Sequence, residues 1–596
     1  MALVKNTRFR QSLLVTAGIV AAPALAATVI ITTGKAASSA STTPGTAPVT
    51  LASSAVPLAT AGAGAGAVTA KASGSAPGTP LLLGAQTHFS QGWPAGVGDL
   101  AAQAQAPLLR DSLPWAAGET AKGRYALGSA AAQNLMAACQ AGRRLILTEI
   151  PTNPLYDNGL WVSSEQGRAA FAAYLGALKD KFGSCLVAIE LGNEINGSRA
   201  MVFAGGIDSV AAYVRIAAAA HARLGGNPAL LGGSTNMIGT GFLRPLFAAG
   251  LLAQVDGIAV HPYRNRGEGL DVELAQLTAA MDGAGQRVPV WATEFGLATT
   301  DQATAAGELV KQATMLAAGG VGQASWYALI DQSGFPTMGL FAGTAIKDQG
   351  RAFRFLQASV LPKGRPVRLD LGDPLLFAYR LGSDTTVIWG APRGLVLGSG
   401  TRAYGPTGQA LAAPAIGDQP IVLVGTDYTL GASAVVADTL LGWGTPAWRY
   451  FVRNRAGSDT ALDWLDDTWT GYFGNKFSKP LRINATSAAP AGDAAAPLRA
   501  VWRYTAPLAQ AVDLRGCFAK APGGDGVDLA VLRNGKALWQ GVLTSGLQPG
   551  PVPVDLAKGD RLDIVAGPNQ AFGSDAFFYR VVLFRRGQSA AVACPN

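Results

Sequence analysis

Two glutamates that end apolar runs have the residue type and the setting of a catalytic pair. Glu194 follows the run LVAIEL, directly after Gly192 and Asn193, and Glu294 closes the run VPVWATE, 100 residues further along the chain. A protonated carboxyl group can give its proton to a departing oxygen, and a carboxylate can attack carbon or activate water. Two carboxyl groups that flank one bond are the machinery of glycoside cleavage. Such chemistry requires a fold that brings the two side chains together.

Short apolar runs between residues 81 and 327 alternate with amphipathic, alanine-rich stretches, a pattern typical of parallel β–α units. About 250 residues is the usual size of a (β/α)8 barrel. A doubly wound open sheet is the alternative, but no glycine-rich phosphate turn follows the first run. We therefore predict an α/β fold, a (β/α)8 TIM barrel over residues 80–360, with strands at LLLGA from 81, PLLR from 107, RLILTE from 144, LVAIEL from 186, ALLGG from 229, DGIAV from 256, VPVWAT from 288 and GQASWY from 322.

Polar residues gather at the C-terminal ends of these runs, where barrel enzymes carry their sites. Glu194 and Glu294 would end the fourth and seventh strands and meet across the barrel mouth. An amide beside a carboxyl group can hold a sugar 2-hydroxyl, which favours Glu194 as acid/base, Glu294 as nucleophile and Asn193 as substrate ligand. Glu190 has the parity of Glu194 in its strand, and we expect it to be a structural acid inside the barrel. The other strand-end residues that we expect at the mouth include His88, Arg110, His261, Tyr263 and Trp326.

Five motifs occur in the order found in the retaining (β/α)8 glycosidases of clan A: RDSLPWAAGETAKGRY from 110, IELGNE, IAVHPY, WATEFG and SWY. Residues 81–360 thus resemble these enzymes, most closely the family 39 and family 5 glycosidases, including exopolysaccharide-associated hydrolases. The resemblance implies retention of configuration, with the carboxyl groups about 5 Å apart. It implies that Arg110 orients the nucleophile, that His261 and Tyr263 line the cleft and that Trp326 is a sugar platform. One departure is Ile195, where many relatives carry proline.

Each of these residues also has a structural alternative. The two glutamates could be ion-paired interior acids, Arg110 could form a structural salt bridge, and Trp326 could plug the barrel. His88 and His261 could be satisfied core residues. We predict no cofactor and no metal site, because the three histidines are far apart in the sequence and lack ligand spacing.

The first 79 residues predict export. A basic stretch precedes the apolar run, and the Ala24-Leu25-Ala26 site within that run completes a secretory signal over residues 1–35. If it stays uncleaved, the segment 13–34 is long enough to act as a membrane tether. Residues 36–79 are almost entirely Ala, Ser, Thr, Gly, Pro and Val, which predicts a disordered linker. The protein is therefore expected in the periplasm, at the cell surface or outside the cell.

The net charge of +9 does not indicate a nucleic-acid partner. Residues 1–80 hold five basic and no acidic residues, whereas residues 81–360 hold 19 basic and 20 acidic ones, and residues 361–596 hold 23 and 18. Nothing in the folded parts forms the dense basic stripe that phosphate binding requires.

The four cysteines fall into two pairs, Cys139 with Cys185 and Cys517 with Cys594, without zinc-site spacing. In an oxidising compartment we expect two disulfides, with buried free thiols as the alternative.

The chain after the barrel has the pattern of β-structure. Residues 361–428 predict a small β domain packed on the barrel, and residues 429–596 predict a β-sandwich with a hairpin at Asn534-Gly535. The sandwich holds half of the twelve tryptophans, which could bind carbohydrate or form its core: Trp443, Trp448, Trp464, Trp469, Trp502 and Trp539.

The sequence therefore predicts an exported retaining glycoside hydrolase that acts on a β-linked poly- or oligosaccharide. The alternatives are a glycan-binding or scaffold protein with a disabled barrel, and a transglycosylase that uses the same residues.

Overall fold

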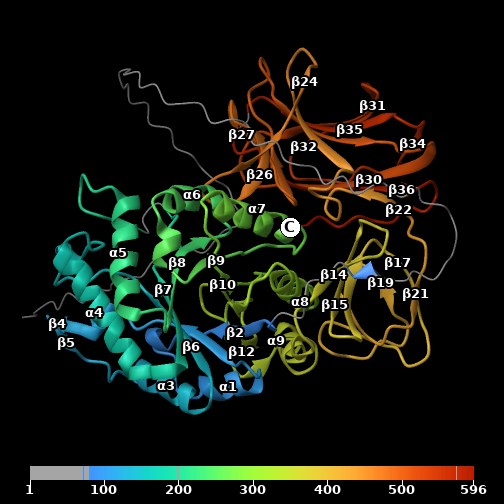
Figure 1. Cartoon of the computed structure of the whole chain (residues 1–596). Coiled ribbons are helices and arrows are strands. Elements are labelled where there is room, and N and C mark those ends of the chain that lie inside the picture. Colours follow the sequence, from blue (N-terminus) through green and yellow to red (C-terminus); the bar gives the residue numbers. More distant parts are fainter. Residues whose placement is uncertain (1–70, 73–78, 198–200, 572, 596) are drawn as a thin grey trace, which may run out of the picture.

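The computed structural model describes residues 71–72, 79–197, 201–571 and 573–595 (Figure 1). The predicted signal (1–35), the tether within it (13–34) and most of the linker lie outside these residues. Two linker residues are an exception, because β1 (Lys71–Ala72) pairs antiparallel with β14 (Val367–Asp370). Among the helices that the structure describes, none is both long and apolar enough to cross a membrane.

Within the described residues, eight parallel strands close into a barrel, as predicted. Each predicted run forms one strand, and the runs are continuously apolar because a strand inside a ring of helices is buried on both faces. In barrel order the strands are β2 (Leu82–Gln86), β3 (Leu108–Asp111), β6 (Arg144–Glu149), β7 (Leu186–Leu191), β8 (Ala229–Asn236), β9 (Gly257–His261), β10 (Val290–Phe295) and β11 (Gln323–Trp326).

Helices surround the barrel, and several begin where a short polar side chain caps their first turn. Ser129 accepts a hydrogen bond from the amide of Ala132, and Asp208 accepts from the amides of Val210 and Ala211. The helices are α1 (Val97–Gln103), α2 (Trp115–Gly118), α3 (Ala130–Gln140), α4 (Glu165–Phe182), α5 (Ser209–Leu224), α6 (Thr240–Ala248), α7 (Leu270–Gly283), α8 (Gln302–Ala318) and α9 (Asp348–Phe355). Small hairpins add β4 (Glu119–Ala121) with β5 (Arg124–Tyr125), and β12 (Phe341–Ala342) with β13 (Ala345–Ile346).

Both predicted disulfides are present. Cys139, at the end of α3, is joined to Cys185, just before β7, and Cys517 in β30 (Gln510–Lys520) is joined to Cys594. The first closes 46 residues of the barrel, and the second ties the C-terminal segment to a central strand of the sandwich.

A small β unit follows the barrel and shares a hydrophobic core with it. Phe377, Tyr379 and Trp389 belong to the same buried cluster as the barrel helices, and the indole N–H of Trp389 donates to Glu268 at 2.9 Å. One sheet pairs β1 and β14 with β15 (Leu376–Leu381), β16 (Thr385–Gly390), β20 (Ile421–Val424) and β18 (Arg402–Tyr404); the other holds β17 (Arg393–Leu397), β19 (Ala415–Ile416) and β21 (Tyr428–Leu430).

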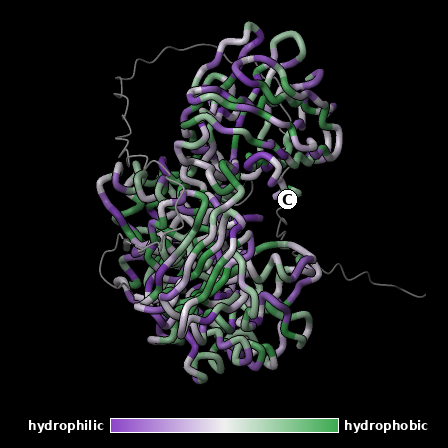
Figure 2. Tube along the Cα trace, turned by 90° about the vertical axis from the view of Figure 1, so that its right-hand side faces the viewer, coloured by the Kyte–Doolittle hydropathy of each residue, from purple (hydrophilic) through white to green (hydrophobic). Residues whose placement is uncertain are grey.

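The C-terminal sandwich forms the upper lobe in both views of the chain (Figures 1 and 2). Its predicted hairpin is present, with positive φ at both Asn534 and Gly535. One sheet contains β22 (Val435–Asp438), β25 (Asp463–Asp466), β26 (Gly471–Asn475), β27 (Ser478–Ile483), β28 (Ser487–Ala489), β30, β33 (Gly546–Leu547), β34 (Val552–Leu556) and β36 (Phe577–Arg585). The other contains β23 (Trp448–Arg453), β24 (Asp459–Ala461), β29 (Arg499–Thr505), β31 (Val527–Arg533), β32 (Lys536–Leu543) and β35 (Arg561–Pro568).

Candidate active site

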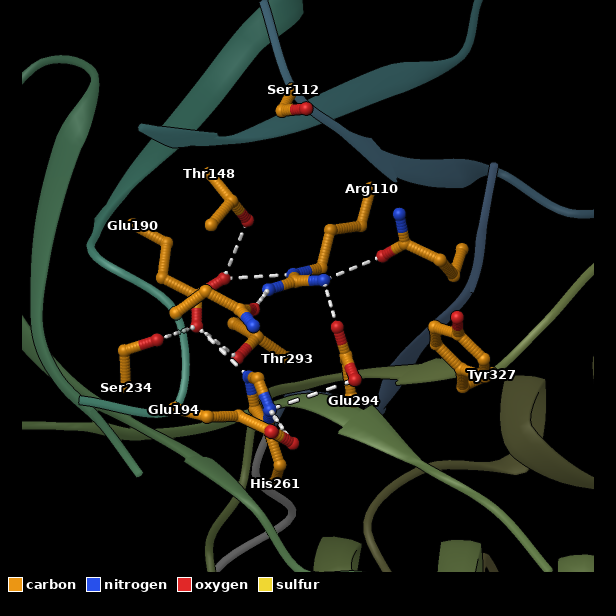
Figure 3. A network of polar contacts seen from close by, with 12 residues as sticks. Arg110, Ser112, Thr148, Glu190, Glu194, Ser234, His261, Thr293, Glu294 and Tyr327 are labelled. Atoms are coloured by element: carbon orange, nitrogen blue, oxygen red, sulfur yellow. Dashed lines mark hydrogen bonds and ion pairs between the residues drawn. The ribbon is translucent and has the colours of Figure 1, made fainter. Parts of the chain in front are cut away.

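Glu190 is the centre of a polar network inside the barrel (Figure 3). Its carboxylate is fully buried, and as expected from its parity in β7 it points into the barrel. Burial opposes its charge, but Arg110 and His261 outweigh that cost and hold the pKa of Glu190 far below its usual value. Its hydrogen-bond donors come from five strands: Arg110 Nε at 2.7 Å, Thr148 Oγ1 at 2.8 Å, Ser234 Oγ at 2.7 Å, His261 Nε2 at 3.1 Å and Thr293 Oγ1 at 2.8 Å.

Arg110 connects this interior acid to the mouth of the barrel. Besides its bond to Glu190, its Nη1 pairs with Glu294 and donates to Gln86 Oε1 at 2.6 Å, while its Nη2 donates to Asn193 Oδ1 at 2.9 Å. Although the side chain is buried, the two glutamates raise the pKa of Arg110 above its already high value. The guanidinium therefore forms a buried ion pair and also fixes a predicted catalytic residue.

Glu294 is held at both oxygens. Oε1 pairs with Arg110, and Oε2 accepts a 2.6 Å hydrogen bond from the hydroxyl of Tyr263. His261 Nδ1 lies 3.6 Å from the same Oε2. Burial and the nearby negative charge of Glu294 raise the pKa of Tyr263, so its hydroxyl remains a donor. The carboxylate has one fixed orientation and is only 7% exposed.

Glu194 lies opposite in a different environment. It follows β7 with a φ of 48°, in the left-handed region that is costly for a residue with a side chain and is concentrated at functional sites. A quarter of its side chain is exposed, and its Oε1 lies 3.4 Å from His261 Nδ1. Burial opposes its charge, but the hydrogen bond and charge of His261 prevail and lower its pKa.

His261 connects all three acids. Its Nε2 faces Glu190, and its Nδ1 faces both Glu194 and Glu294. Burial favours the neutral ring, but the carboxylates, Glu294 first, raise the pKa of His261 to about 10. At neutral pH the ring is an imidazolium, so with Arg110 two cations face three carboxylates.

Glu194, His261 and Glu294 each offer one ligand atom, and these atoms lie within 4.8 Å of one another. That geometry would suit a small ion, but a metal requires the neutral imidazole. The protonated state of His261 opposes metal binding here.

The aromatic residue at the barrel mouth is not the predicted Trp326. Trp326 is fully buried, its indole N–H donates to the carbonyl of Met338 at 2.8 Å, and its ring packs against Phe295. The prediction that Trp326 is a sugar platform is therefore wrong. The ring does not plug the barrel either, because it lies in the hydrophobic core between the barrel and its helices. The next residue, Tyr327, lies beside Glu294 (Figure 3), and the charge of Glu294 adds to burial in raising the pKa of Tyr327.

His88 packs edge-on against Trp93 and Tyr327, with ring centroids 5.1 and 5.5 Å away. Burial lowers the pKa of His88 to about 4, so the ring is neutral at pH 7. Among the described residues, nothing bonds to its buried Nε2. This nitrogen is thus an unsatisfied, buried polar atom beside the barrel mouth.

Asn193 is half-buried, and its Oδ1 is occupied by Arg110. In the part of the chain that the structure describes, its amide nitrogen makes no hydrogen bond, which leaves it free to donate to a ligand. The structure thus brings together every predicted site residue except Trp326, and adds Tyr327 and Gln86.

Comparisons with known proteins give matches to solved structures only; no protein-family model and no curated protein matches the chain. A family 39 glycoside hydrolase from the gut symbiont Bacteroides cellulosilyticus WH2 is 16% identical, covers 58% of this chain and 81% of its own, and has a TM-score of 0.49. A family 39 β-xylosidase from Caulobacter crescentus is 14% identical over 59% of this chain and 97% of its own, with a TM-score of 0.43. A family 30 subfamily 8 xylanase from Clostridium acetobutylicum is 14% identical over 60% and 97%, with a TM-score of 0.42. At these identities and TM-scores the function has to be inferred from the site.

Proposed function

We propose that this protein is an exported retaining glycoside hydrolase that cleaves O-glycosidic bonds of a β-linked poly- or oligosaccharide. The observation that carries the proposal is the separation of Glu194 and Glu294, whose facing atoms lie within 4.8 Å at the barrel mouth. Retaining enzymes hold their carboxyl groups about 5–5.5 Å apart, whereas inverting enzymes need about 6.5–9.5 Å to admit water. The short separation favours a covalent glycosyl-enzyme.

Glu294 has the surroundings of the nucleophile. Arg110 and Tyr263 hold both of its oxygens, which fixes one lone pair toward the anomeric carbon. In the first step Glu294 forms a bond to that carbon while the bond to the leaving oxygen breaks, and the leaving oxygen takes a proton from Glu194. In the second step Glu194 removes a proton from water, whose oxygen displaces Glu294.

The proton for the first step is shared by Glu194 and His261. The pKa of Glu194 is lowered and that of His261 is raised to about 10, so in the free protein the proton resides on His261 Nδ1, 3.4 Å from Glu194 Oε1. Two groups this close titrate as a pair, and transfer along this hydrogen bond makes Glu194 the acid. His261 is thus a positioning residue that supplies the proton through Glu194.

The substrate ligands follow from the unoccupied polar atoms. The amide of Asn193 would hold the sugar 2-hydroxyl, and His88 Nε2 would accept from or donate to a second hydroxyl. Tyr327 and Tyr263 would border the sugar ring, in place of the predicted platform at Trp326. Two disulfides support an oxidising compartment, and with the predicted signal they favour action on a cell-surface or extracellular glycan.

The test is release of reducing sugar from β-glucans, xylans, mannans and bacterial exopolysaccharides. Wild type is compared with Glu194→Gln, Glu294→Gln and Glu165→Gln, the last being an exposed glutamate in α4 and a matched control. Loss of the acid/base is expected to cost about 100- to 10,000-fold, loss of the nucleophile at least as much, and Glu165→Gln nothing.

Azide separates the two roles on an activated aryl glycoside. Azide is expected to rescue Glu194→Ala with retained configuration in the glycosyl azide, and Glu294→Ala with inverted configuration. Wild type that binds a polymer without turnover would instead indicate a scaffold protein, and wild type that transfers sugar mainly to added acceptors would indicate a transglycosylase.

A further inference from the structure

A loop of the C-terminal sandwich, residues 466–470, contacts the segment that carries Glu194. The contact is made by Asn196, whose side-chain amide donates to the carbonyl of Thr468 at 2.7 Å and to the carbonyl of Asn236 at 3.0 Å. Its Oδ1 accepts from the amide of Asn236 at 2.9 Å. The buried Asn196 thus ties the loop after β7, the end of β8 and the sandwich into one unit.

The 466–470 loop also packs closely on the start of α6, at the mouth end of the barrel. A Cβ atom on Gly239 would lie 2.6 Å from the carbonyl oxygen of Thr468, and one on Gly241 would lie 2.6 Å from that of Asp467. Only glycine permits this backbone-to-backbone approach. The loop is therefore seated on the rim of the mouth next to the proposed acid/base.

The loop is internally fixed. Asp467 Oδ1 accepts from the amides of Trp469 and Thr470 at 2.8 and 2.9 Å, and Oδ2 pairs with Arg482 of β27. Asp466 pairs with Arg244 of α6 at 2.7 Å. The backbone of this loop is held in place before any ligand arrives, which lowers the entropic cost of binding to a side chain that the loop carries.

Trp469 is the aromatic residue of this loop, and its position differs from those of the other sandwich tryptophans. Trp443, Trp448 and Trp502 are buried in the sandwich core, and Trp464 and Trp539 are half-buried against it. Trp469 is half-buried as well, but among the described residues its indole belongs to no hydrophobic cluster and stacks on no other ring. The sandwich core therefore does not account for this tryptophan.

We propose that Trp469 forms a sugar-binding subsite on the leaving-group side of the cleft, stacking on a pyranose ring of the β-linked chain beyond the scissile bond. This inference rests on the proposed function, in which Glu194 protonates the leaving oxygen, so that the leaving-group sugars lie on the Glu194 side. An indole presents a large apolar face that suits the C–H face of a sugar ring. The sandwich then contributes to the specificity of the barrel, and a chain long enough to reach Trp469 is the preferred substrate.

The experiment compares Trp469→Ala with Trp539→Ala, a matched control on the outer strand β32. Two substrates are used for each: the hexasaccharide that wild type cleaves among cello-, xylo-, manno- and laminarihexaose, and the glycosyl fluoride of the same sugar. Fluoride is too small to occupy a leaving-group subsite. In Trp469→Ala the ratio of kcat/KM for the hexasaccharide to that for the fluoride is expected to fall about tenfold, the loss typical of an aromatic binding residue, whereas Trp539→Ala keeps the wild-type ratio.

If this kcat/KM ratio is unchanged in Trp469→Ala, the proposed subsite is refuted, while the proposed glycosidase activity is not affected. An equal loss on both substrates, together with a lower unfolding temperature, would assign Trp469 a structural role. Calorimetric titration of the four hexasaccharides into Glu294→Gln, with and without Trp469→Ala, provides a readout that needs no turnover. If wild type is inert but Trp469→Ala weakens this binding about tenfold, the proposed glycosidase activity is refuted and the proposed subsite is supported. If Glu294→Gln binds the hexasaccharides equally well with and without Trp469→Ala, the subsite is refuted.

Discussion

Replacing Arg110 with methionine is expected to destabilise the barrel strongly. Arg110 is 2% exposed, and its guanidinium is shared by the buried carboxylates of Glu190 and Glu294. Methionine fills much of the volume but supplies no charge and no donor. Removing one partner of a buried ion pair costs about 3–5 kcal/mol, because the other charge stays buried without compensation. At pH 7 we expect a loss of free energy of unfolding in that range.

The loss should depend on pH in a defined direction. In wild type the pKa of Glu190 is lowered, so its contribution is present above the unfolded pKa and is constant between pH 5 and 7. In Arg110→Met the burial cost prevails over the remaining His261 charge, and the pKa of Glu190 rises above the unfolded value. The folded variant then binds the extra proton as the pH falls, and its stability increases from pH 7 to pH 5. The difference in free energy of unfolding between wild type and Arg110→Met therefore becomes smaller toward pH 5.

Urea unfolding at pH 5 and pH 7 measures both effects, with Arg110→Met/Glu190→Gln as the matched double variant. Because the double variant leaves no unpaired charge at position 190, we expect it to be more stable than Arg110→Met at pH 7. The reasoning is refuted if Arg110→Met lies within about 0.5 kcal/mol of wild type, the range of an ordinary surface substitution. It is equally refuted if Arg110→Met loses the same free energy of unfolding at both pH values and the double variant is less stable than Arg110→Met.

Three further predictions concern single contacts. Tyr263→Phe removes the 2.6 Å donor to Glu294 and is expected to lower kcat/KM roughly 10- to 100-fold without unfolding the protein; wild-type kinetics in this variant would show that the hydroxyl does not position the proposed nucleophile. His88 has its pKa lowered from 6.5 to about 4, so the unfolded chain binds the proton first, and wild type should lose about 3 kcal/mol as the pH falls from 6.5 to 4. His88→Gln should lack this part of the loss in urea titrations, and an identical pH slope would contradict the burial argument. Replacing Cys139 and Cys185 with alanine opens a 46-residue loop and should lower the free energy of unfolding, measured in urea, by about 4 kcal/mol. An unchanged free energy of unfolding would contradict this loop-closure argument.

The barrel could be predicted because its signal is local. A parallel strand with both faces buried must be continuously apolar, and the run LVAIEL is one such segment that became β7 (Leu186–Leu191) without a shift. Side chains alternate between the two faces of a strand, and this alternation predicted that Glu190 is an acid inside the barrel. The fourth and seventh runs therefore placed Glu194 and Glu294 at one mouth before any side-chain contact was known.

The error at Trp326 has a simple cause. Side chains alternate along a strand, and Trp326 and Ala324 share the face of β11 that packs against the outer helices. The opposite parity belongs to Ser325 and Tyr327, so the tyrosine reaches the mouth. The prediction chose Trp326 for its larger ring, whereas the position of each residue in the alternation along the strand indicates Tyr327.

Other features depend on contacts that no local pattern contains. β10 has a register irregularity between Ala292 and Phe295, the stretch that contains Glu294, and alternation cannot anticipate such a shift. The bond from Asn196 to Thr468 spans 272 residues and joins two parts of the chain that have separate hydrophobic cores. The sequence suggested sugar binding by sandwich tryptophans in general, but only this contact distinguishes Trp469 from the others.

Glu190 explains why the site has its particular proton arrangement, although it lies too deep to meet a substrate. Its anion accepts from His261 Nε2 at 3.1 Å, which turns the other ring nitrogen toward Glu194 and Glu294 and favours the imidazolium. It also accepts from Arg110 Nε, which directs the rest of the guanidinium to Glu294 and Asn193. Both cations that contact the proposed catalytic pair are thus oriented by one buried acid. A neutral residue at position 190 would lower the pKa of His261. Because the His261 charge lowers the pKa of Glu194, the proton that the two groups share would then shift toward Glu194.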